Sequence, residues 1–233
     1  PSCSPTRASV LTGRHPNRCG TFSPGWSIRP EEITVARLLK DAGYYCGHFG
    51  KWHLGTLTKT DKDANRGGPQ GKEHFSPPQA NGFDVCFSTE SKVPTWNPMD
   101  KPKVDARRTW WDISDDTEPY GTAYWDEKGR RVTKNLAGAN SRVILDRAIP
   151  FMRSAAQKEQ PFFTIVWFHT PHLPVVAGPE YARMYADEDK YTQHYRGCIT
   201  AMDEQVGRLR NELRAMGVAN NTPVSYTHLT LPT

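Results

Sequence analysis

Three short segments carry the residues whose types and spacing could do chemistry. The first is CSPTR, which contains Cys3 and, four positions on, Arg7. The second is GKWHLG, with Lys51 and His53, and the third is PHLP, with His172. A thiol, two cations and two imidazoles are the groups that nucleophilic attack, anion stabilisation and proton transfer need. We therefore take these five residues as the candidate active site.

The first segment is predicted to open a helix. Ser4 as the cap, Pro5 at the first helical position and Gly13 just past the end predict a short helix over residues 4–11. Cys3 would then lie just before a helix N-terminus, where backbone N–H groups favour negative charge.

The other two segments follow predicted strands. Residues 44–49 read as a strand that leads into Lys51 and His53, and an extended chain would point these two side chains to the same side. The apolar run 161–168 predicts a strand buried on both faces, and it leads towards His172. Ligands bind at the carboxyl ends of strands in open α/β sheets, so the pattern predicts one site at that edge.

The rest of the chain alternates helical patterns with strands. Helices are predicted over 30–42, 139–157 and 191–216, a further strand over 82–88, and loop-rich segments over 56–81 and 90–131. The first of these helices has an apolar face formed by Ile33, Ala36, Leu38 and Leu39. Pro150 is expected to kink the second helix. The alternation favours an α/β fold with a mostly parallel sheet.

Composition excludes several classes of protein. The 233 residues carry 30 Lys and Arg against 25 Asp and Glu, and this net charge of +5 suits an anionic ligand without indicating nucleic acid. Hydrophobic residues make up 36% and aromatic residues 11%, enough for a core and too many for a disordered chain. No apolar run approaches the roughly 20 residues that a membrane-spanning helix needs.

Cysteine and histidine spacing gives no metal or redox motif. The five cysteines include no Cys-x-x-Cys pair: Cys3, Cys19, Cys46, Cys86 and Cys198. If Cys3 has a chemical role, the other four form either two disulfides or four thiols, and a Cys19–Cys46 pair is one option. His169 and His172 have a spacing that can bind zinc, but no third ligand of a suitable type lies nearby.

The three motifs together resemble those of the type I sulfatases. The family signature, Cys-x-Pro-x-Arg followed by Thr-Gly, stands at 3–13, and Gly-Lys-Trp-His-Leu-Gly stands unchanged at 50–55. A His flanked by prolines after a hydrophobic strand stands at 171–174. The resemblance implies an alkaline-phosphatase-like α/β fold, a mixed, mostly parallel sheet flanked by helices that is incomplete here. It also implies the hydrolysis of a sulfate ester.

The resemblance further implies how the five residues act. A formylglycine-generating enzyme would oxidise Cys3 to an aldehyde, whose hydrate attacks sulfur with one hydroxyl and expels the covalent sulfate through the other. Arg7 would hold this hydrate, and Lys51 would bridge it to a sulfate oxygen. His53 would take the proton of the second hydroxyl. His172 would bind sulfate and act as general acid on the leaving oxygen.

The family also uses a divalent cation, usually calcium, with oxygen ligands. The only such ligand expected in this chain is the modified Cys3, and the family's acidic pairs are expected before Pro1 and after Thr222. We therefore expect the natural protein to be longer, active, and periplasmic or secreted. The chain as given is expected to be inactive.

The resemblance sets the expected domain organisation. Residues 1–223 would form a partial catalytic domain, with 56–131 as an insertion at the substrate rim, and 224–233 would be a non-native tail derived from a sequencing adaptor. The substrate is expected to be a sulfated small molecule or glycan. The rim has side chains that suit a sulfated sugar: Lys92, Lys101, Lys103, Arg107, Arg108, Trp110, Trp111 and Trp125.

Several alternatives stay open at this point. His169 is either a substrate contact or a hydrogen-bonded histidine at a strand end. The protein could instead be a phosphonate or phosphate monoester hydrolase of the same fold, or a chain that binds anions without catalysis. A papain-like Cys–His pair is disfavoured, because Pro5 and Arg7 would have no role in it.

Overall fold

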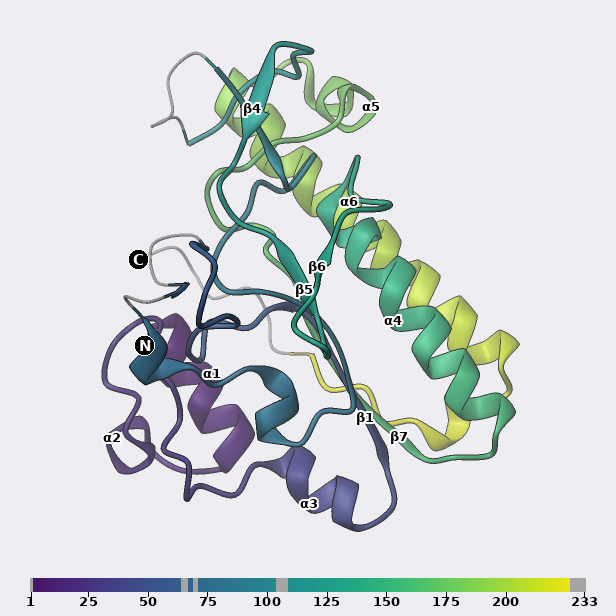
Figure 1. Cartoon of the computed structure of the whole chain (residues 1–233). Helices are drawn as coiled ribbons and strands as arrows, with labels where there is room; N and C mark the ends of the chain where they lie inside the picture. Colours follow the sequence, from purple (N-terminus) through teal and green to yellow (C-terminus); the bar gives the residue numbers. More distant parts are fainter. Residues whose placement is uncertain (1, 64–66, 69–70, 104–108, 227–233) are drawn as a thin grey trace.

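A mixed five-stranded sheet forms the centre of the computed structural model, which describes residues 2–63, 67–68, 71–103 and 109–226 (Figure 1). The strands lie in the order β6-β5-β2-β1-β7. Their bounds are β1 Tyr45–Lys51, β2 Val85–Thr89, β5 Tyr124–Asp126, β6 Arg131–Val132 and β7 Phe162–Trp167. The predicted α/β class, a mixed sheet flanked by helices, is confirmed.

The parallel part of the sheet is built around β1. This strand pairs in parallel with β2 on one side and β7 on the other, whereas β5 runs antiparallel to β2 and β6 antiparallel to β5. The prediction that β7 is buried on both faces is wrong, because only Ile165 in it is fully buried. β7 is an edge strand of the sheet that the structure describes, so its side chains have fewer neighbours.

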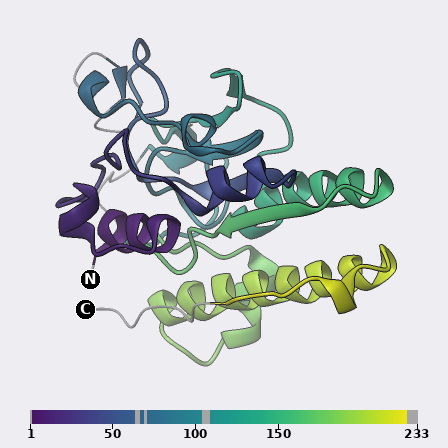
Figure 2. The same cartoon turned by 90° about the horizontal axis from the view of Figure 1, so that it is seen from below.

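Helices cover both faces of the sheet (Figure 2). On one face lie α1 Cys3–Thr12, α2 Pro16–Cys19 and α3 Val35–Asp41. On the other lie α4 Asn140–Gln157 and α6 Lys190–Ala215, with the short α5 Pro179–Ala182 against α6. Single 3-10 turns occupy Lys72–His74, Pro78–Asn81, Arg183–Tyr185 and Ala219–Asn221.

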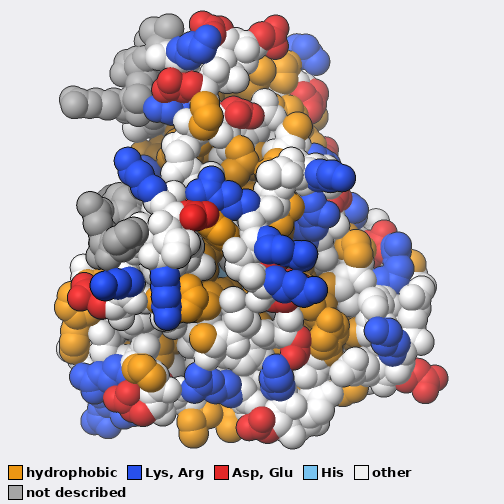
Figure 3. All heavy atoms as spheres, viewed as in Figure 1, with side chains coloured by type: hydrophobic (Ala, Val, Ile, Leu, Met, Phe, Trp, Pro, Cys, Tyr) orange, Lys and Arg blue, Asp and Glu red, His pale blue; other side chains and the backbone are white. Residues whose placement is uncertain are grey.

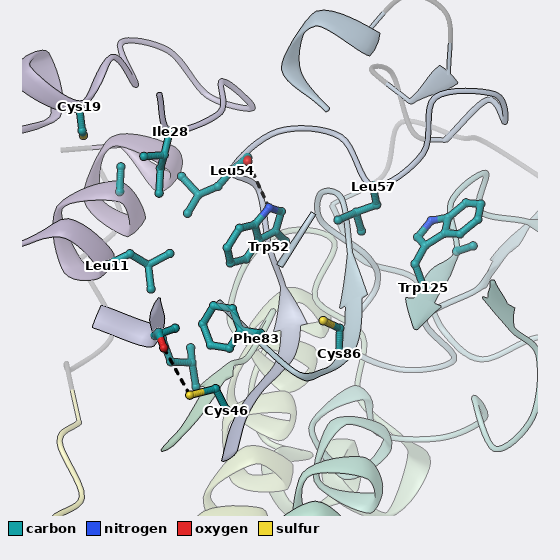
Figure 4. Packing of buried hydrophobic residues seen from close by; sticks show 14 residues of the cluster. Leu11, Cys19, Ile28, Cys46, Trp52, Leu54, Leu57, Phe83, Cys86 and Trp125 are labelled. Atoms are coloured by element: carbon teal, nitrogen blue, oxygen red, sulfur yellow. Dashed lines mark hydrogen bonds between the residues drawn. The ribbon is translucent and has the colours of Figure 1, made fainter. Parts of the chain in front are cut away.

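The first core packs between α1, α3 and the sheet. Figure 4 shows Trp52 at its centre, with Leu11 approaching from α1 and Phe83 close by. The indole Nε1 of Trp52 donates to the carbonyls of Leu54, at 3.1 Å, and Ser76, at 2.7 Å. Full burial of a large apolar side chain contributes about 1.5–3 kcal/mol. This core therefore fixes the chain on both sides of Lys51 and His53.

The second core lies between α4, α6 and the opposite face of the sheet. The predicted stripe of α4 is confirmed, since its members are all buried: Val143, Leu145, Ala148, Ile149 and Met152. The helix continues without interruption through Pro150. The predicted α6 is also confirmed, beginning after Asp189, whose side chain accepts from the Thr192 amide at 3.2 Å.

Two helix starts differ from prediction. The first helix begins at Cys3 with Ser2 as its cap residue, so the predicted cap Ser4 lies inside the helix and is buried. The third begins at Val35, capped by Thr34, rather than at the predicted Pro30. Local sequence favoured a later start for the first helix and an earlier start for the third, but tertiary contacts use Ser4 and Glu32 otherwise.

The loop-rich segment 90–131 contains more regular structure than predicted. β3 Asp100–Pro102 and β4 Thr117–Pro119 form a separate two-stranded antiparallel sheet. β5 joins the main sheet, and its Trp125, which was expected at the substrate rim, is buried in the first core. The predicted rim residues Arg107 and Arg108 lie outside the described residues, as does most of the predicted tail 224–233.

All five cysteines are free thiols, which matches the alternative of four thiols beside Cys3 rather than a Cys19–Cys46 pair. Cys3 is half-buried, and the other four are buried. Among the residues in the described ranges, no helix is both long and apolar enough to cross a membrane. Figure 3 shows Lys and Arg side chains scattered over the visible face rather than gathered in one patch.

Candidate active site

The candidate nucleophile, Cys3, is the first residue of α1 and is half-buried. Its sulfur accepts a hydrogen bond from Lys51 Nζ at 3.6 Å. Lys51 is the last residue of β1. The start of a helix and the carboxyl end of a parallel strand therefore meet here, as the strand-edge argument predicts.

Ser4 connects α1 to the loop after β1. Its hydroxyl donates to the His53 carbonyl and accepts from the Gly25 amide at 2.7 Å. The side chain is fully buried, so both bonds are shielded from water. Ser4 thus holds the helix start against the His53 turn instead of capping the helix.

Arg7 lies one helical turn after Cys3 and faces the same site. One of its terminal nitrogens donates to the Lys51 carbonyl at 2.6 Å, and its guanidinium carbon lies 4.3 Å from the centre of the Trp167 ring. Burial lowers the pKa of Arg7 to about 10, and the neighbouring Cys3 opposes this shift. Arg7 therefore stays a fixed cation at neutral pH.

Lys51 is only 3% exposed, which makes its charge costly. Burial lowers the pKa of Lys51 to about 8, and the positive charge of Arg7 adds to the effect while Cys3 opposes it. Two cations packed this closely create a strong demand for an anion. Lys92 also lowers the pKa of Lys51, so it lies within electrostatic range of the site.

His53 adopts an unusual backbone conformation, with φ at 55°. Its amide donates to the Glu90 carbonyl at 3.0 Å, which ties the turn to the end of β2. The prediction that Lys51 and His53 point to the same side along an extended chain is therefore wrong, because β1 ends at Lys51. His53 is 8% exposed, and its place beside Ser4 keeps it near the Cys3 end of α1.

His172 lies in an exposed turn after β7, between two cis peptide bonds that precede Pro171 and Pro174. Its Nδ1 pairs with the Leu173 carbonyl at 2.8 Å, so Nδ1 carries a proton and the neutral ring presents Nε2 as an acceptor. Desolvation and the charge of Lys51 lower the pKa of His172. The ring is therefore neutral at neutral pH before an anion binds.

His169 has a different environment from His172. It is 2% exposed, and its two ring nitrogens pair with the side chains of Thr89 and Asn140, each at 2.8 Å. These bonds match the strand-end alternative, whereas the substrate contact stays a prediction. No sequence pattern indicates Thr89, Asn140 or the Trp167 ring next to Arg7, since all three act through side-chain contacts between distant segments.

Comparison with protein families decides the identity of this arrangement. A family model described as "Sulfatase" matches residues 1–227. The chain belongs to the sulfatase family. Its sulfatase motifs are the segments that the fold brings together around Cys3 and Lys51.

Known sulfatases are similar along nearly the whole chain. An ulvan-active sulfatase of Formosa agariphila is 26% identical over 250 residues, and an N-acetylgalactosamine-6-sulfatase of Rattus norvegicus is 28% identical over 244 residues. Each match covers 97% of this chain and 40% of the relative. This sulfatase chain therefore spans less than half the length of those relatives.

Solved structures agree on the fold. The crystal structure of Ps i-CgsB in complex with k-i-k-neocarrahexaose has a TM-score of 0.68 at 23% identity, and the match covers 92% of this chain and 45% of that one. A phosphonate monoester hydrolase from Silicibacter pomeroyi has a TM-score of 0.57 at 18% identity, covering 95% and 51%. The sulfatase fold thus resembles that of an enzyme named for another ester.

The sulfatase site does not contain a metal-binding set of its own. Within the described ranges, no group of three or more His, Cys, Asp and Glu side chains could hold an ion. Lys51 lies against the Cys3 sulfur, so the nearest charge there is positive. The described residues therefore do not form a cation site by themselves.

Proposed function

We propose that the complete protein hydrolyses the sulfate ester of a sulfated carbohydrate, using formylglycine made from Cys3. The observation that supports this most is the contact of Cys3 Sγ with Lys51 Nζ, with Arg7 bound to the Lys51 carbonyl. A nucleophile position beside the buried Lys51 and the half-buried Arg7 suits the attack on an anionic ester, because the charges offset the repulsion of the approaching group.

The environment of Cys3 is compatible with the modification. It is the one thiol that is not buried among the five, and it lies at the start of a helix. The formylglycine hydrate would supply two hydroxyls on one carbon, one to attack sulfur and one to release the sulfate. Its partner in synthesis would be a formylglycine-generating enzyme. The other thiols are unsuited to such a role, and burial raises the pKa of Cys46 to about 11.

The surrounding cations would bind and orient. Arg7, with its guanidinium over the Trp167 ring, would hold the hydroxyls of residue 3 in place. Lys51 would contact both residue 3 and a sulfate oxygen, since its ammonium lies at the sulfur position already. A bound sulfate would raise the pKa of Lys51 from about 8 and keep it charged.

The two histidines would move protons. His53, fixed by Ser4 and Glu90, would accept the proton of the second hydroxyl. His172 would take up a proton when the sulfate anion binds, because a nearby negative charge raises its lowered pKa. It would then donate from Nε2 to the oxygen of the leaving alcohol.

A divalent cation, calcium by family resemblance, stays part of the proposal for the complete protein. Its ligands other than residue 3 would come from outside this chain, which is why we expect the chain alone to be inactive. The periplasmic or secreted location stays a prediction.

The substrate class is proposed from the relatives and the rim. One relative is named for ulvan and another for N-acetylgalactosamine, and Ps i-CgsB was solved with a sugar oligomer. Lys92 lies within electrostatic range of both Lys51 and His172, where it would attract a sulfated chain. Lys101 and Lys103 are already paired with Glu118 and Asp116, which reduces their availability.

The test uses the complete enzyme, co-expressed with a formylglycine-generating enzyme. The peptide containing residue 3 should lose about 18 Da relative to the thiol. Release of sulfate from sulfated glycans should exceed hydrolysis of matched phosphate and phosphonate esters, and Cys3→Ala should abolish it. A phosphate or phosphonate preference would establish the alternative hydrolase. An unmodified, inactive protein that still binds sulfate would establish the anion-binding alternative.

A further inference from the structure

A continuous chain of buried polar side chains runs behind the site. The Tyr124 hydroxyl, on β5, pairs with the Asn140 amide at 2.8 Å, and Asn140 pairs with His169 Nδ1 at 2.8 Å. His169 Nε2 pairs with the Thr89 hydroxyl at 2.8 Å, and this hydroxyl donates to the Ser91 carbonyl at 2.7 Å. No side chain in this set except Ser91 is more than 2% exposed. A buried polar network of this kind stabilises the fold only when every donor and acceptor in it has a hydrogen-bond partner.

One proton arrangement keeps the bond from Thr89 to Ser91 when the ring is neutral. The single proton of Thr89 then goes to the Ser91 carbonyl, and Thr89 accepts from Nε2–H of His169. Nδ1 of His169 is then an acceptor. This arrangement requires the flipped Asn140 amide, with its NH₂ group at Nδ1 and its oxygen at the Tyr124 hydroxyl.

The neutral state follows from the surroundings of the ring. Burial lowers the pKa of His169 well below its usual value, and the charges of Lys51, Arg7 and His172 add to this, while the Ser91 carbonyl opposes it. A third positive charge beside the cations Lys51 and Arg7 would be unfavourable. His169 is therefore a rigid donor and acceptor rather than an acid or base.

The network connects the two segments that carry reactive groups. The His169 carbonyl accepts from the His172 amide at 2.7 Å, which shapes the turn bearing the proposed general acid. The Thr89 carbonyl accepts from the Trp52 amide at 2.9 Å, between Lys51 and His53. The His169 ring thus connects the ends of β2 and β7 to the first residue of α4.

We propose that His169 is a positioning residue, whose neutral ring holds the His172 turn in register with Lys51 through Thr89 and Asn140. This inference rests on the proposed function for its effect on catalysis. With both ring nitrogens occupied and the side chain behind the sheet end, His169 does not touch the substrate.

The kinetic test compares two replacements in the complete, modified enzyme. His169→Leu fills a similar volume with an apolar side chain and removes both hydrogen bonds of the ring. We expect kcat to fall about 100-fold, which is the effect of misplacing a reacting group by about 1 Å. KM should change less than about threefold. His169→Gln offers a donor and an acceptor and should recover kcat to within about tenfold of the parent. The pH profile should shift in the Leu variant only, because His172 has moved.

A matched control is His194→Leu, which removes another histidine that is 2% exposed but lies on α6, where its Nδ1 accepts from the Ala177 amide. Its kcat, calculated per mole of folded protein, should stay within about threefold of that of the parent. A rise in KM with unchanged kcat in His169→Leu would show a substrate contact and overturn the inference. So would a folded Leu variant with parental kcat.

A spectroscopic test is independent of the reaction and of whether the variants fold. In the complete protein labelled with ¹⁵N-histidine, His169 should show a protonated Nε2 and a bare Nδ1 throughout pH 5.5–8.5. An imidazolium or the Nδ1–H tautomer at this residue would overturn the inference. If the enzyme instead hydrolysed no sulfate ester while His169 showed this tautomer, the proposed function would fail and the hydrogen-bond assignment would stand.

Discussion

The ammonium of Lys51 lies 3.6 Å from the sulfur of Cys3, although 48 positions separate the two residues in sequence. The contact joins the last residue of β1 to the first residue of α1. Both positions are set by packing in the first core, where α1 and the segment after β1 share apolar contacts. Packing in this core therefore holds the two residues together before any substrate binds.

Loss of the positive charge on Lys51 should cause the fall in kcat/KM at alkaline pH. Because its pKa is lowered to about 8, the ammonium loses its proton as the pH rises through that value, and kcat/KM should fall there. Lys51→Met should lower kcat/KM by about 100- to 1,000-fold. The exposed Lys158→Met is the control and should behave as the parent. A parental profile that stays level up to pH 9.5 would contradict the role of this cation.

Arg7 should not be replaceable by lysine. A lysine keeps the charge but loses the contact of the guanidinium with the Trp167 ring and the directed bond to the Lys51 carbonyl. We expect Arg7→Lys to lower kcat by about 100-fold, measured as sulfate release by the complete enzyme. Arg18→Lys, at an exposed position of α2, should have no effect. Equal activity of the two variants would show that charge alone suffices at position 7.

Loss of the Ser4 hydroxyl should destabilise the start of α1. Ser4→Ala leaves the buried Gly25 amide without its acceptor and removes the bond to the His53 carbonyl. The expected cost is about 1–3 kcal/mol in the free energy of unfolding, measured by chemical denaturation. Thr6→Ala, exposed on the same helix, should cost far less. Equal costs would mean that helix propensity, not the buried bonds, is being measured.

Asp63 should anchor the loop 56–81 to β5. Its carboxylate accepts from Thr122 Oγ1 and Trp125 Nε1, both at 2.6 Å, and the residue is 1% exposed. Asp63→Ala would leave the buried Trp125 indole and the half-buried Thr122 hydroxyl without their acceptor, so limited proteolysis should cut the loop faster. Asp61→Ala serves as the control, because it removes only exposed contacts, an ion pair with Arg131 and a hydrogen bond from Thr60. Unchanged cleavage in Asp63→Ala would show that the loop is held elsewhere.

Local patterning predicted most of the regular elements. The strands before Lys51 and before His169, and the long helices α4 and α6, lie within a few residues of their predicted bounds. Their side chains repeat with a period that burial on one face or both requires, and this signal is local. The predictions failed where a residue serves a distant partner, as Glu32 does by accepting from Arg14 at 2.8 Å instead of opening a helix.

The sequence by itself determined which reactive groups the chain carries, their order, and the helix and strand that end beside them. Only the tertiary structure decided which of them meet: that Lys51 reaches Cys3, that Ser4 supports His53, and that His169 is fully bonded behind the site. The reason is physical. Periodicity records whether a side chain is buried, whereas hydrogen bonds between segments 40 to 80 residues apart depend on how the sheet and its helices pack.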